Sequence, residues 1–443
     1  MDIRLSDHFT YSRLLRFTAP PIIMMICISI YGTIDSLFIS NFIGSRAFAA
    51  IGVVFPVLMI LGAFGFMVGS GGNALVAKTL GEQHPKKANE IFSLIVYSTL
   101  ILGIFLSLVG LLLLNPFLDF LGVDGALRQD CLTYAHILIP GTPIVMLQFL
   151  FHSFFIAAER PKLGLFVAVL SGAMNILLDA VFVLGFHWGI AGAAWATIVS
   201  QVVGGCGPLL YFTLPNKSPL RLGKAKVRFE YLLKTYTNGL SEFLSHISAS
   251  FINALYNYQL LRMMGESGVV AYGIIAHVYF LFVAIFLGYS SGSAPIVSYH
   301  YGARNHPELQ NLFKKSLRLI AGAGVCLSSL AIILARPLAD IFVGYDPNLA
   351  NIAIYAFRVY ALSFLVVGFN IYASAFFTAL NNGVISAAIS VSRIFVFKSL
   401  SILILPIFFG INGIWSASVV SESCALIVSI YFLRTRRKKY HYV

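Results

Sequence analysis

Charged residues are scarce in this chain. Asp, Glu, Lys and Arg make up 11% of its 443 residues, against about 25% in a soluble domain, so a soluble globular fold is excluded. The five cysteines are scattered and form no Cys-x-x-Cys pair, which gives no sign of a disulfide framework or a zinc site. No catalytic triad, metal-ligand cluster or phosphate loop is recognisable, so we expect no enzyme, no cofactor and no ATPase subunit. We also expect no cleavable signal peptide, because the first residues are polar and charged.

Long apolar stretches are abundant instead. A helix needs ~20 apolar residues to cross a bilayer, and stretches of that kind recur along the whole chain. No run alternates polar and apolar residues as the strands of a membrane barrel do. We therefore predict an all-α integral membrane protein with twelve transmembrane helices. Their expected ranges are 14–39, 48–77, 91–114, 132–157, 163–185, 190–213, 234–261, 269–299, 316–335, 352–379, 384–409 and 412–433.

The positive charges are distributed unevenly between the loops. If both ends of the chain are cytoplasmic, 23 of the 30 Lys and Arg residues fall in cytoplasmic segments and four in outer loops. Cytoplasmic loops of membrane proteins carry such an excess. The bias supports the helix count and predicts a multi-pass protein of the cell inner (plasma) membrane with both termini cytoplasmic. It also accounts for the net charge of +13 without a nucleic-acid partner.

The two halves of the chain repeat each other at a constant offset of 221 residues. The matches include glycine, proline and acidic residues, which coincide by chance less often than aliphatic residues do in so apolar a chain. We expect two pseudo-symmetric six-helix lobes, 1–220 and 221–443, in the same orientation because six is even. Duplicated bundles usually belong to transporters that rock one half against the other. Matched pairs are Gly44 and Gly265, Ser70 and Ser291, Gly81 and Gly302, Pro116 and Pro337, Asp119 and Asp340, and Gly189 and Gly410.

Two acids, Asp35 and Asp179, lie well inside spans of the first half. A charge in the hydrocarbon region is costly and marks a functional candidate. Tyr31 and Asn175 each stand four positions before one of the acids, on the same helix face. With Thr197 in the sixth span, these side chains are expected to form one polar pocket. Two acids in a partly dry pocket suit proton coupling near neutral pH, and Asp35, Asn175 and Asp179 also offer oxygens to Na⁺. The alternative is that the acids face a wet cavity and only hydrogen-bond to neighbouring helices.

The second half does not copy this pocket. At the 221-residue offset Asp35 corresponds to Tyr256 and Asp179 to Leu400, so ion coupling is expected to be asymmetric. Its own polar residues within spans are candidates for lining a substrate cavity. The alternatives are a structural salt bridge between Arg393 and Glu422 and a packing role for the lone His277, since a single intramembrane His is more often a packing residue than a proton carrier. These candidates are Glu242, Tyr256, His277, Arg393 and Glu422.

Six short motifs follow one another in a characteristic order along the chain. They are Tyr31-Gly-Thr-Ile-Asp35, Gly71-Gly-Asn-Ala74, Asn175-Ile-Leu-Leu-Asp179, Asn238-Gly-Leu-Ser-Glu242, Pro295-Ile-Val-Ser-Tyr299-His-Tyr-Gly302 and Gly410-Ile-Asn-Gly413. In this order and spacing the chain resembles the MATE (multidrug and toxic compound extrusion) family over nearly its full length, most closely the bacterial MepA-like branch.

The resemblance implies two lobes around a central cavity, and export of organic, often cationic, compounds in exchange for H⁺ or Na⁺. It also implies that the first-half pocket is the cation and proton site, and that Pro20 and Pro21 are the hinge at which the first helix bends. Two positions depart from the family pattern. The tenth span has no acid between residues 361 and 379, which favours H⁺ or a first-lobe Na⁺ site. His300 stands where Asn is common in the Ser-Tyr-x-Tyr-Gly motif.

We therefore predict a monomeric secondary antiporter in the lipid bilayer that exports small lipophilic or cationic organic compounds by alternating access. The nearest alternative is a flippase for a lipid-linked oligosaccharide. It needs a strongly basic cavity, and only Arg393 and Lys398 are evident. An exporter of one specific metabolite is a further alternative. A channel usually assembles from several subunits, and a membrane enzyme needs a clustered catalytic set.

Overall fold

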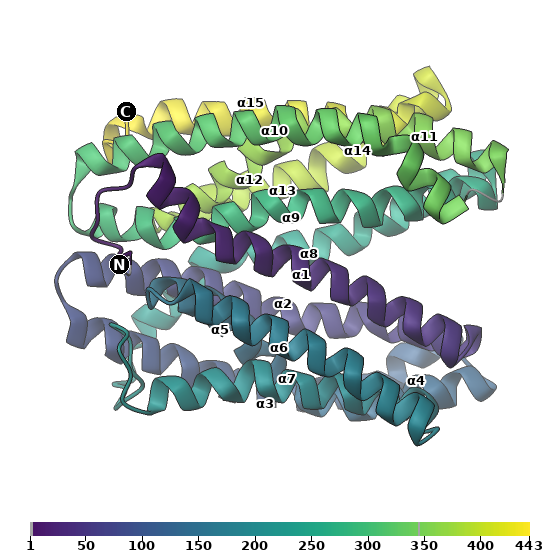
Figure 1. Ribbon diagram of the computed structural model, residues 1–443, viewed down its shortest axis with the longest axis horizontal. Helices are drawn as coiled ribbons and strands as arrows, with labels where there is room; N and C mark the ends of the chain where they lie inside the picture. Colours follow the sequence, from purple (N-terminus) through teal and green to yellow (C-terminus); the bar gives the residue numbers. More distant parts are fainter. Residues whose placement is uncertain (1–2, 344–345) are drawn as a thin grey trace.

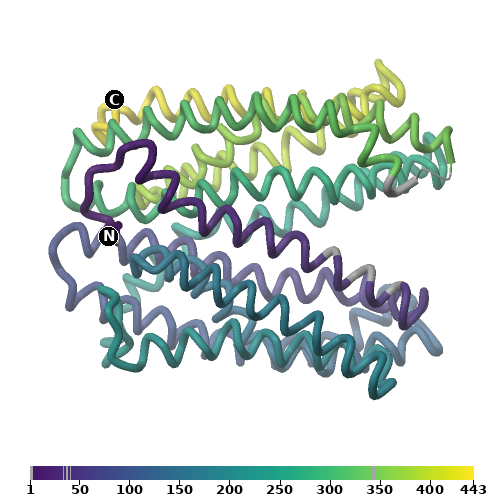
Figure 2. Tube along the Cα trace, viewed as in Figure 1, coloured from purple at the N-terminus to yellow at the C-terminus, as the bar shows by residue number. Residues whose placement is uncertain are grey.

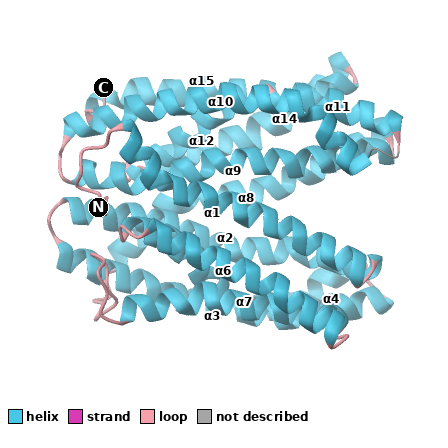
Figure 3. Ribbon diagram, in the orientation of Figure 1, coloured by secondary structure: helices cyan, strands magenta, loops and turns pink. Residues whose placement is uncertain are grey.

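Helices account for all regular secondary structure in the computed structural model, which describes residues 3–343 and 346–443, without the side chains of 33, 36, 37, 40 and 341–343 (Figure 3). The all-helical prediction is confirmed. The first half contains α1 Tyr11–Phe42, α2 Ser45–Gly81, α3 Pro85–Phe120, α4 Gly125–Leu138, η1 Ile139–Gly141, α5 Thr142–Ala157, α6 Pro161–Asp179, η2 Ala180–Gly185 and α7 Gly189–Thr213. The second half contains α8 Phe229–Met264, α9 Glu266–Gly302, α10 His306–Val343, α11 Pro347–Ala361, α12 Phe364–Ala379, α13 Gly383–Val391, η3 Ser392–Phe397, α14 Lys398–Phe409 and α15 Ile411–Tyr440.

Each of the twelve predicted spans falls on one helical rod, and the same rods are interrupted in both halves. The fourth rod breaks between α4 and α5 in the first half and between α11 and α12 in the second, where the two helices are bent by 49°. The fifth rod contains a π-helical turn in both halves, η2 and η3. Glycine with positive φ stands at the start of the sixth rod both times, with φ of 56° at Gly189 and 57° at Gly410. The sequence repeat is thus also a repeat of local structure.

Length and composition alone identify most of these rods as membrane-spanning. Among the described residues ten helical stretches are long and apolar enough, and eleven if the bent pair of α11 and α12 counts as one span. The remaining rod, α8, has 36 residues but is too polar to be recognised in this way. Its buried polar residues are Thr235, Asn238, Ser241 and Ser248. These side chains face the interior of the protein rather than lipid, which is where polar residues of membrane helices are usually found.

The helices form two bundles that lie side by side (Figure 1). We call α1–α7 the N-terminal bundle and α8–α15 the C-terminal bundle. Figure 2 shows both chain termini at the same end of the molecule, here called the termini end. The ribbons of the bundles lie close together at this end and diverge toward the other. The helix α1 runs obliquely between them.

Glycine allows the bundles to meet closely at the termini end. A Cβ added to Gly81, the last residue of α2, would overlap the Tyr299 carbonyl of α9. A Cβ added to Gly302, the last residue of α9, would overlap the Lys78 carbonyl of α2. Each contact maps onto the other at the 221-residue offset, so the pseudo-two-fold axis passes between α2 and α9 at this crossing. Only glycine permits backbones to approach so closely.

Candidate functional site

Asp35 of α1 and Asp179 of α6 lie side by side within the N-terminal bundle. α1 packs closely on α6 because Gly172 has no side chain: a Cβ there would lie 3.1 Å from Cδ1 of Tyr31. Tyr31 stands one turn before Asp35, so this contact holds the same face of α1 toward α6. Asp179 is the last residue of α6 and is 1% exposed. The structure thus brings the two predicted acids together.

The two carboxyl groups are within hydrogen-bonding reach of each other. Such a bond needs a proton on one of them, because an ionised carboxylate has nothing to donate. With both ionised, Oδ1 of Asp35 and both oxygens of Asp179 are buried without a hydrogen-bond donor among the described residues. Leaving buried charge without donors costs several kcal/mol. The pocket therefore favours a bound proton or cation.

Two further polar residues line the acid pair. Asn175 is one turn before Asp179 on α6 and is 4% exposed, as predicted from the spacing. Tyr134 of α4 was not predicted: its phenol is 5% exposed and lies close enough to feel the charge of both acids. The sequence carries no signal for it, because a single tyrosine in a span is usually a packing or belt residue.

Thr197, the fifth residue of the predicted pocket, uses its hydroxyl within its own helix. It donates to the Ala193 carbonyl on α7 at 3.0 Å. Ser200 donates to the Thr197 carbonyl at 2.8 Å, and its own carbonyl accepts from Ser171 of α6 at 2.7 Å. These bonds join α7 to α6. A lone pair on the threonine oxygen remains able to accept a proton or coordinate a cation.

The backbone changes form at the acid pair. The π-helical turn η2 begins at Ala180, directly after Asp179. π-Turns within α-helices are rare and frequently mark functional sites. Val183 from this turn packs with Ile39 and Ala193 in a small apolar cluster between α1 and α7. Asp179 therefore lies at the end of a regular helix, next to a change of helix type, whereas Asp35 lies within the continuous helix α1.

In the C-terminal bundle, Glu422 is held by two cations and an amide. Its Oε1 is 3.5 Å from Arg393 Nη1 and 3.9 Å from Lys398 Nζ. Asn370 Nδ2 donates to Glu422 Oε2 and to its main-chain carbonyl, both at 2.9 Å. Ser429 donates in turn to Asn370 Oδ1 at 2.8 Å. The anticipated pair of Arg393 and Glu422 is present, and its network also includes a lysine that was not anticipated in it.

Lys398 is almost completely buried, with 7% exposure. It donates to Ser418 at 3.0 Å, and its ammonium lies 5.6 Å from the ring centre of Tyr279 and 5.8 Å from that of Tyr360. Cation–π contacts of this kind gain strength when they are desolvated. The ammonium is thus compensated by a carboxylate, a hydroxyl and two aromatic faces.

The other second-half candidates lie in different surroundings. Glu242 of α8 is close enough to Arg393 to feel its charge. His277 of α9 is exposed, and its Nδ1 pairs with the Gly273 carbonyl at 2.8 Å. Tyr256 is fully buried and stacks on Tyr272 with ring centres 4.5 Å apart, so it belongs to the core of the C-terminal bundle.

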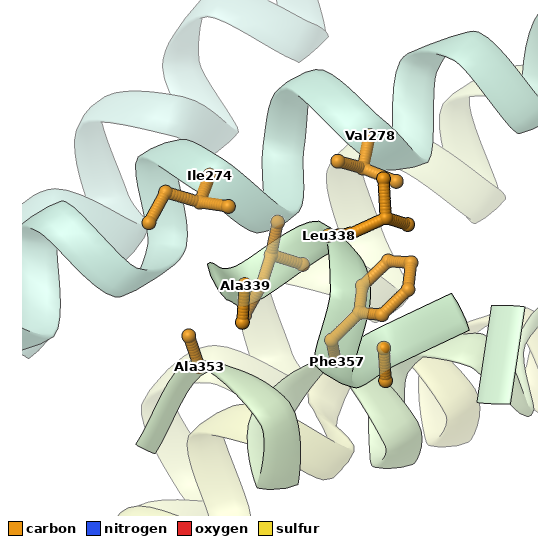
Figure 4. Close-up of a pocket in the computed structure, with 8 residues that line it drawn as sticks. Ile274, Val278, Leu338, Ala339, Ala353 and Phe357 are labelled. Carbon is orange, nitrogen blue, oxygen red and sulfur yellow. The ribbon is translucent and has the colours of Figure 1, made fainter. Parts of the chain in front are cut away.

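A small pocket in the same bundle lies between α9, α10 and α11 (Figure 4). All its lining side chains are aliphatic or aromatic, so it offers no polar group to fix a ligand's orientation. We do not assign a function to it. The residues labelled in Figure 4 are Ile274, Val278, Leu338, Ala339, Ala353 and Phe357.

Pro20 and Pro21 mark the point where α1 changes partner. The helix is continuous through both prolines. Before them, Phe17 packs in the core of the C-terminal bundle. At them, α1 crosses α9 so closely that a Cβ on Gly288 would come 2.8 Å from the Pro21 carbonyl. After them, Tyr31 lies on α6 of the N-terminal bundle. Two missing hydrogen bonds make this stretch the easiest part of α1 to bend.

The family model MatE matches the chain twice, at residues 20–181 and 243–403. The chain belongs to the MatE family. The two matches begin almost one repeat apart, as expected for a duplicated bundle. Membership makes the protein a membrane transporter rather than an enzyme, as the sequence predicted.

Named relatives are similar over almost the whole chain. The multidrug export protein MepA of Staphylococcus haemolyticus is 24% identical over 437 residues, which cover 96% of this chain and 94% of MepA. The protein of the same name from Staphylococcus aureus (strain NCTC 8325 / PS 47) is 24% identical over 438 residues, with the same coverage. The predicted resemblance to the MepA-like branch is confirmed.

Solved structures share the fold. A crystal structure of MATE in complex with MaL6 superposes with a TM-score of 0.93 at 21% identity and covers 98% of both chains. An outward-facing multidrug resistance MATE family transporter of the MOP superfamily superposes with a TM-score of 0.92 at 22% identity, covering 97% of this chain and 96% of the other. A twelve-rod, two-bundle architecture is therefore common to all three.

Proposed function

We propose that this protein is a proton-coupled antiporter that exports small lipophilic, mostly cationic organic compounds across the plasma membrane by alternating access. The observation that supports this most directly is the acid pair of Asp35 and Asp179. Three of its four carboxyl oxygens are buried without a donor among the described residues. A site that is electrostatically incomplete until it binds a proton or a cation suits exchange.

A proton suits this site better than Na⁺. Two carboxyl groups within reach of each other share one proton readily, since like charges at close range cannot both ionise cheaply. Sodium would instead need several oxygens that converge on one point. Asn175 and Tyr134 remain as neutral partners on either side. We assign the coupling role to Asp35 and Asp179, with Na⁺ as the outcome that the experiment below distinguishes.

The coupling would work by competition between ion and substrate. A ligand shifts a conformational equilibrium only by its differential affinity for the two states. Proton binding at the acid pair removes the negative charge that holds an organic cation, and so favours substrate release on one side of the membrane. The proposed moving units are 1–220 and 221–443, with both termini cytoplasmic, and Pro20 and Pro21 allow α1 to bend between them. The printed names of the MepA relatives support multidrug export.

The flippase alternative receives little support from the second half. Two intramembrane cations of this half, Arg393 and Lys398, both contact Glu422. Their charge is thereby compensated, and Glu242 lies close enough to Arg393 to feel its charge. A basic surface for a diphosphate-linked oligosaccharide is absent from this cluster of described residues. A single-metabolite exporter would share the coupling site and differ only in its range of substrates.

Ethidium uptake into everted vesicles tests the proposal. An acid interior or a Na⁺-loaded interior is imposed in turn, and wild type is compared with Asp35→Asn and Asp179→Asn. We expect uptake with the acid interior and background uptake in both variants. Uptake that follows only the Na⁺ gradient would make Na⁺ the coupling ion. Full uptake in both variants would move the coupling site elsewhere, with Glu242 next in line.

A matched control removes a carboxylate that has no place in the mechanism. Glu230 is exposed at the start of α8 and pairs with Lys234 at 2.6 Å, one turn away. Glu230→Gln should transport like wild type. A panel of unrelated dyes then separates multidrug export from export of one metabolite, which would leave most dyes untransported.

A further inference from the structure

Residues 3–10, the N-terminal strap, cross from one bundle to the other at the termini end. In Figure 1 this segment lies where the two bundles meet, ahead of α1. Two of its apolar side chains are buried, Leu5 at 1% and Phe9 at 0% exposure. A terminal segment usually frays unless it is held in place. Burial of this degree requires specific anchors.

The anchor on the C-terminal bundle is Glu308, in the first turn of α10. Its Oε1 accepts from the Phe9 amide at 2.9 Å, and its Oε2 pairs with His8 Nδ1 at 2.5 Å. The Phe9 carbonyl accepts from Lys315 at 2.6 Å and from Asn311 at 3.1 Å. Both main-chain groups of Phe9 are therefore bound to α10. Hydrogen bonds to charged groups are among the stronger ones in proteins.

The Phe9 ring is inserted beside His300 of α9. The two rings meet edge to face with centres 6.4 Å apart, and Phe17 lies against Phe9 in the same way at 6.1 Å. His300 is 2% exposed, and its imidazole lies within hydrogen-bonding reach of the backbone at Leu5 and Asp7 of the strap. The histidine of the Ser-Tyr-x-Tyr-Gly motif therefore lines the site in which the strap is bound.

The anchor on the N-terminal bundle is Glu159, in the turn between α5 and α6. Its Oε1 accepts from the Leu5 amide at 2.7 Å. Ile156, at the end of α5, belongs to the same buried cluster as Leu5 and Phe9. Without Glu159, the buried Leu5 amide would lose its acceptor, and an orphaned buried amide is costly. The strap is thus fixed to both bundles, four residues apart.

We propose that the strap is a latch that holds the bundles together at the termini end and must release before that end opens. This inference rests on the proposed alternating access, because a latch matters only where the bundles separate. The latch acts beside the glycine crossing of α2 and α9 and on the same pair of bundles. Since the chain is continuous between Leu5 and Phe9, detaching either anchor is enough to uncouple the bundles.

Thiol accessibility tests the latch without measuring transport. The reporter is Ala74→Cys, with the five native cysteines replaced by alanine. Ala74 lies on α2, is 3% exposed, and its carbonyl accepts from Asn381 of the other bundle at 3.3 Å. Its maleimide reaction rate in lipid nanodiscs reports how often the termini end opens. We expect Glu159→Ala to raise this rate about tenfold, the effect of losing one good hydrogen bond. Glu308→Ala loses the bonds to Phe9 and His8 and should raise it at least as much.

Two features separate a latch from general loosening. The double variant should react no faster than the faster single variant, because one broken anchor already frees the bundles. Glu159→Gln keeps an acceptor for the Leu5 amide and should react no faster than wild type. A second reporter, Ala356→Cys in the core of the C-terminal bundle, should stay unreactive in every variant, since it opens only on unfolding.

Unchanged rates in both alanine variants would overturn the latch, as would multiplicative rates in the double variant, which indicate two independent local effects. Reaction of the Ala356→Cys reporter would also overturn it, because the anchors would then stabilise the fold itself. Failure of ethidium exchange in wild type would refute the proposed function alone, since the thiol rates are measured without a gradient or a dye.

Discussion

The two bundles descend from one repeated scaffold but treat buried charge in opposite ways. In the N-terminal bundle, Asp35 and Asp179 face each other with three oxygens lacking donors among the described residues. In the C-terminal bundle, Glu422 contacts Arg393, Lys398 and Asn370. The first cluster is incomplete without a proton or cation, and the second is complete as it stands. A duplicated fold can thus carry an uncompensated pair of buried acids in one half and a compensated ion network in the other.

A π-helical turn lies beside the charged cluster in each bundle. A π-helical turn follows Asp179 in the first half, and a π-helical turn contains Arg393 in the second. A π-turn adds a residue to the helix and rotates every later side chain by about one position. At the 221-residue offset the two turns do not coincide: η3 begins about two and a half helical turns before the counterpart of η2. The same device therefore presents different residues in the two bundles.

Removal of Glu422 should produce the largest difference in stability between the two bundles. Glu422→Ala leaves Arg393 and Lys398 as two buried cations without their carboxylate, and loss of one partner of a buried pair costs about 3–5 kcal/mol. Asp179→Asn removes a charge that has no donor, so the free energy of unfolding should stay equal or rise. Thermal unfolding in one detergent measures both. Equal destabilisation by the two substitutions would show that the acid pair is also structural.

Much of this arrangement follows from the sequence. Intramembrane position and i, i+4 spacing identify Asp35, Asp179 and Asn175, because each lies on a regular stretch of helix. The contact of Lys398 with Glu422 does not follow, since the π-turn between residues 392 and 397 changes the register on which such spacing arguments depend. The position of Tyr134 beside the acids cannot be predicted from the sequence either, because it is one aromatic residue among many in an apolar span.

The contacts of the N-terminal strap could not be predicted from sequence patterns, for another reason. Its bonds join residues about 300 positions apart, such as Phe9 and Glu308, and no periodicity connects a loop to a distant helix end. The α8 span was predicted correctly although hydropathy alone is too weak to mark it. The repeat and the alternation of loop charge supplied the missing information, because an odd number of spans would place the second half upside down.

The glycine crossing of α2 and α9 tests whether Gly81 and Gly302 make equivalent contacts. Gly81→Ala and Gly302→Ala each place a methyl group against a backbone carbonyl of the other bundle. Overpacking of this kind costs about 1–3 kcal/mol. Because the contacts are related by the pseudo-two-fold axis, we expect equal effects, seen as equally faster maleimide modification of Ala74→Cys. Gly322→Ala, with no atom within 4 Å of the new Cβ, should change nothing. A large effect of one glycine alone would refute the symmetry of the crossing.

Lys398→Met should produce a smaller change than Glu422→Ala. The substitution removes one of two cations near Glu422, but Arg393 and Asn370 stay in place. Methionine fills a similar volume and packs well against the aromatic faces of Tyr279 and Tyr360. We expect a loss of about 1.5–3 kcal/mol in thermal unfolding, the range for a hydrogen bond to a charged group. A loss as large as that of Glu422→Ala would make the lysine the principal partner of the carboxylate.

The smallest expected effect is a response of the strap to pH. Burial raises the pKa of the Glu159 carboxyl above its ordinary value, although the Leu5 amide, Arg4 and Arg160 favour the ionised form; Asp7 opposes it. A carboxyl whose pKa is higher in the docked state binds more protons there, so docking is favoured as the pH falls through the window between the ordinary and the raised values. As the pH rises through the same window, this contribution is lost.

Acidification should therefore tighten the latch at its N-terminal-bundle anchor. We expect the Ala74→Cys rate to fall by a factor of less than about ten between pH 7 and pH 5, after division by the rate of the same reporter in Glu159→Gln. That ratio removes the pH dependence of the thiol reaction itself, because the glutamine does not titrate. A ratio that stays constant would show that Glu159 makes no pH-dependent contribution to the latch. A ratio that rises with acid would mean that ionised Glu159, held by the Leu5 amide, is the form that docks.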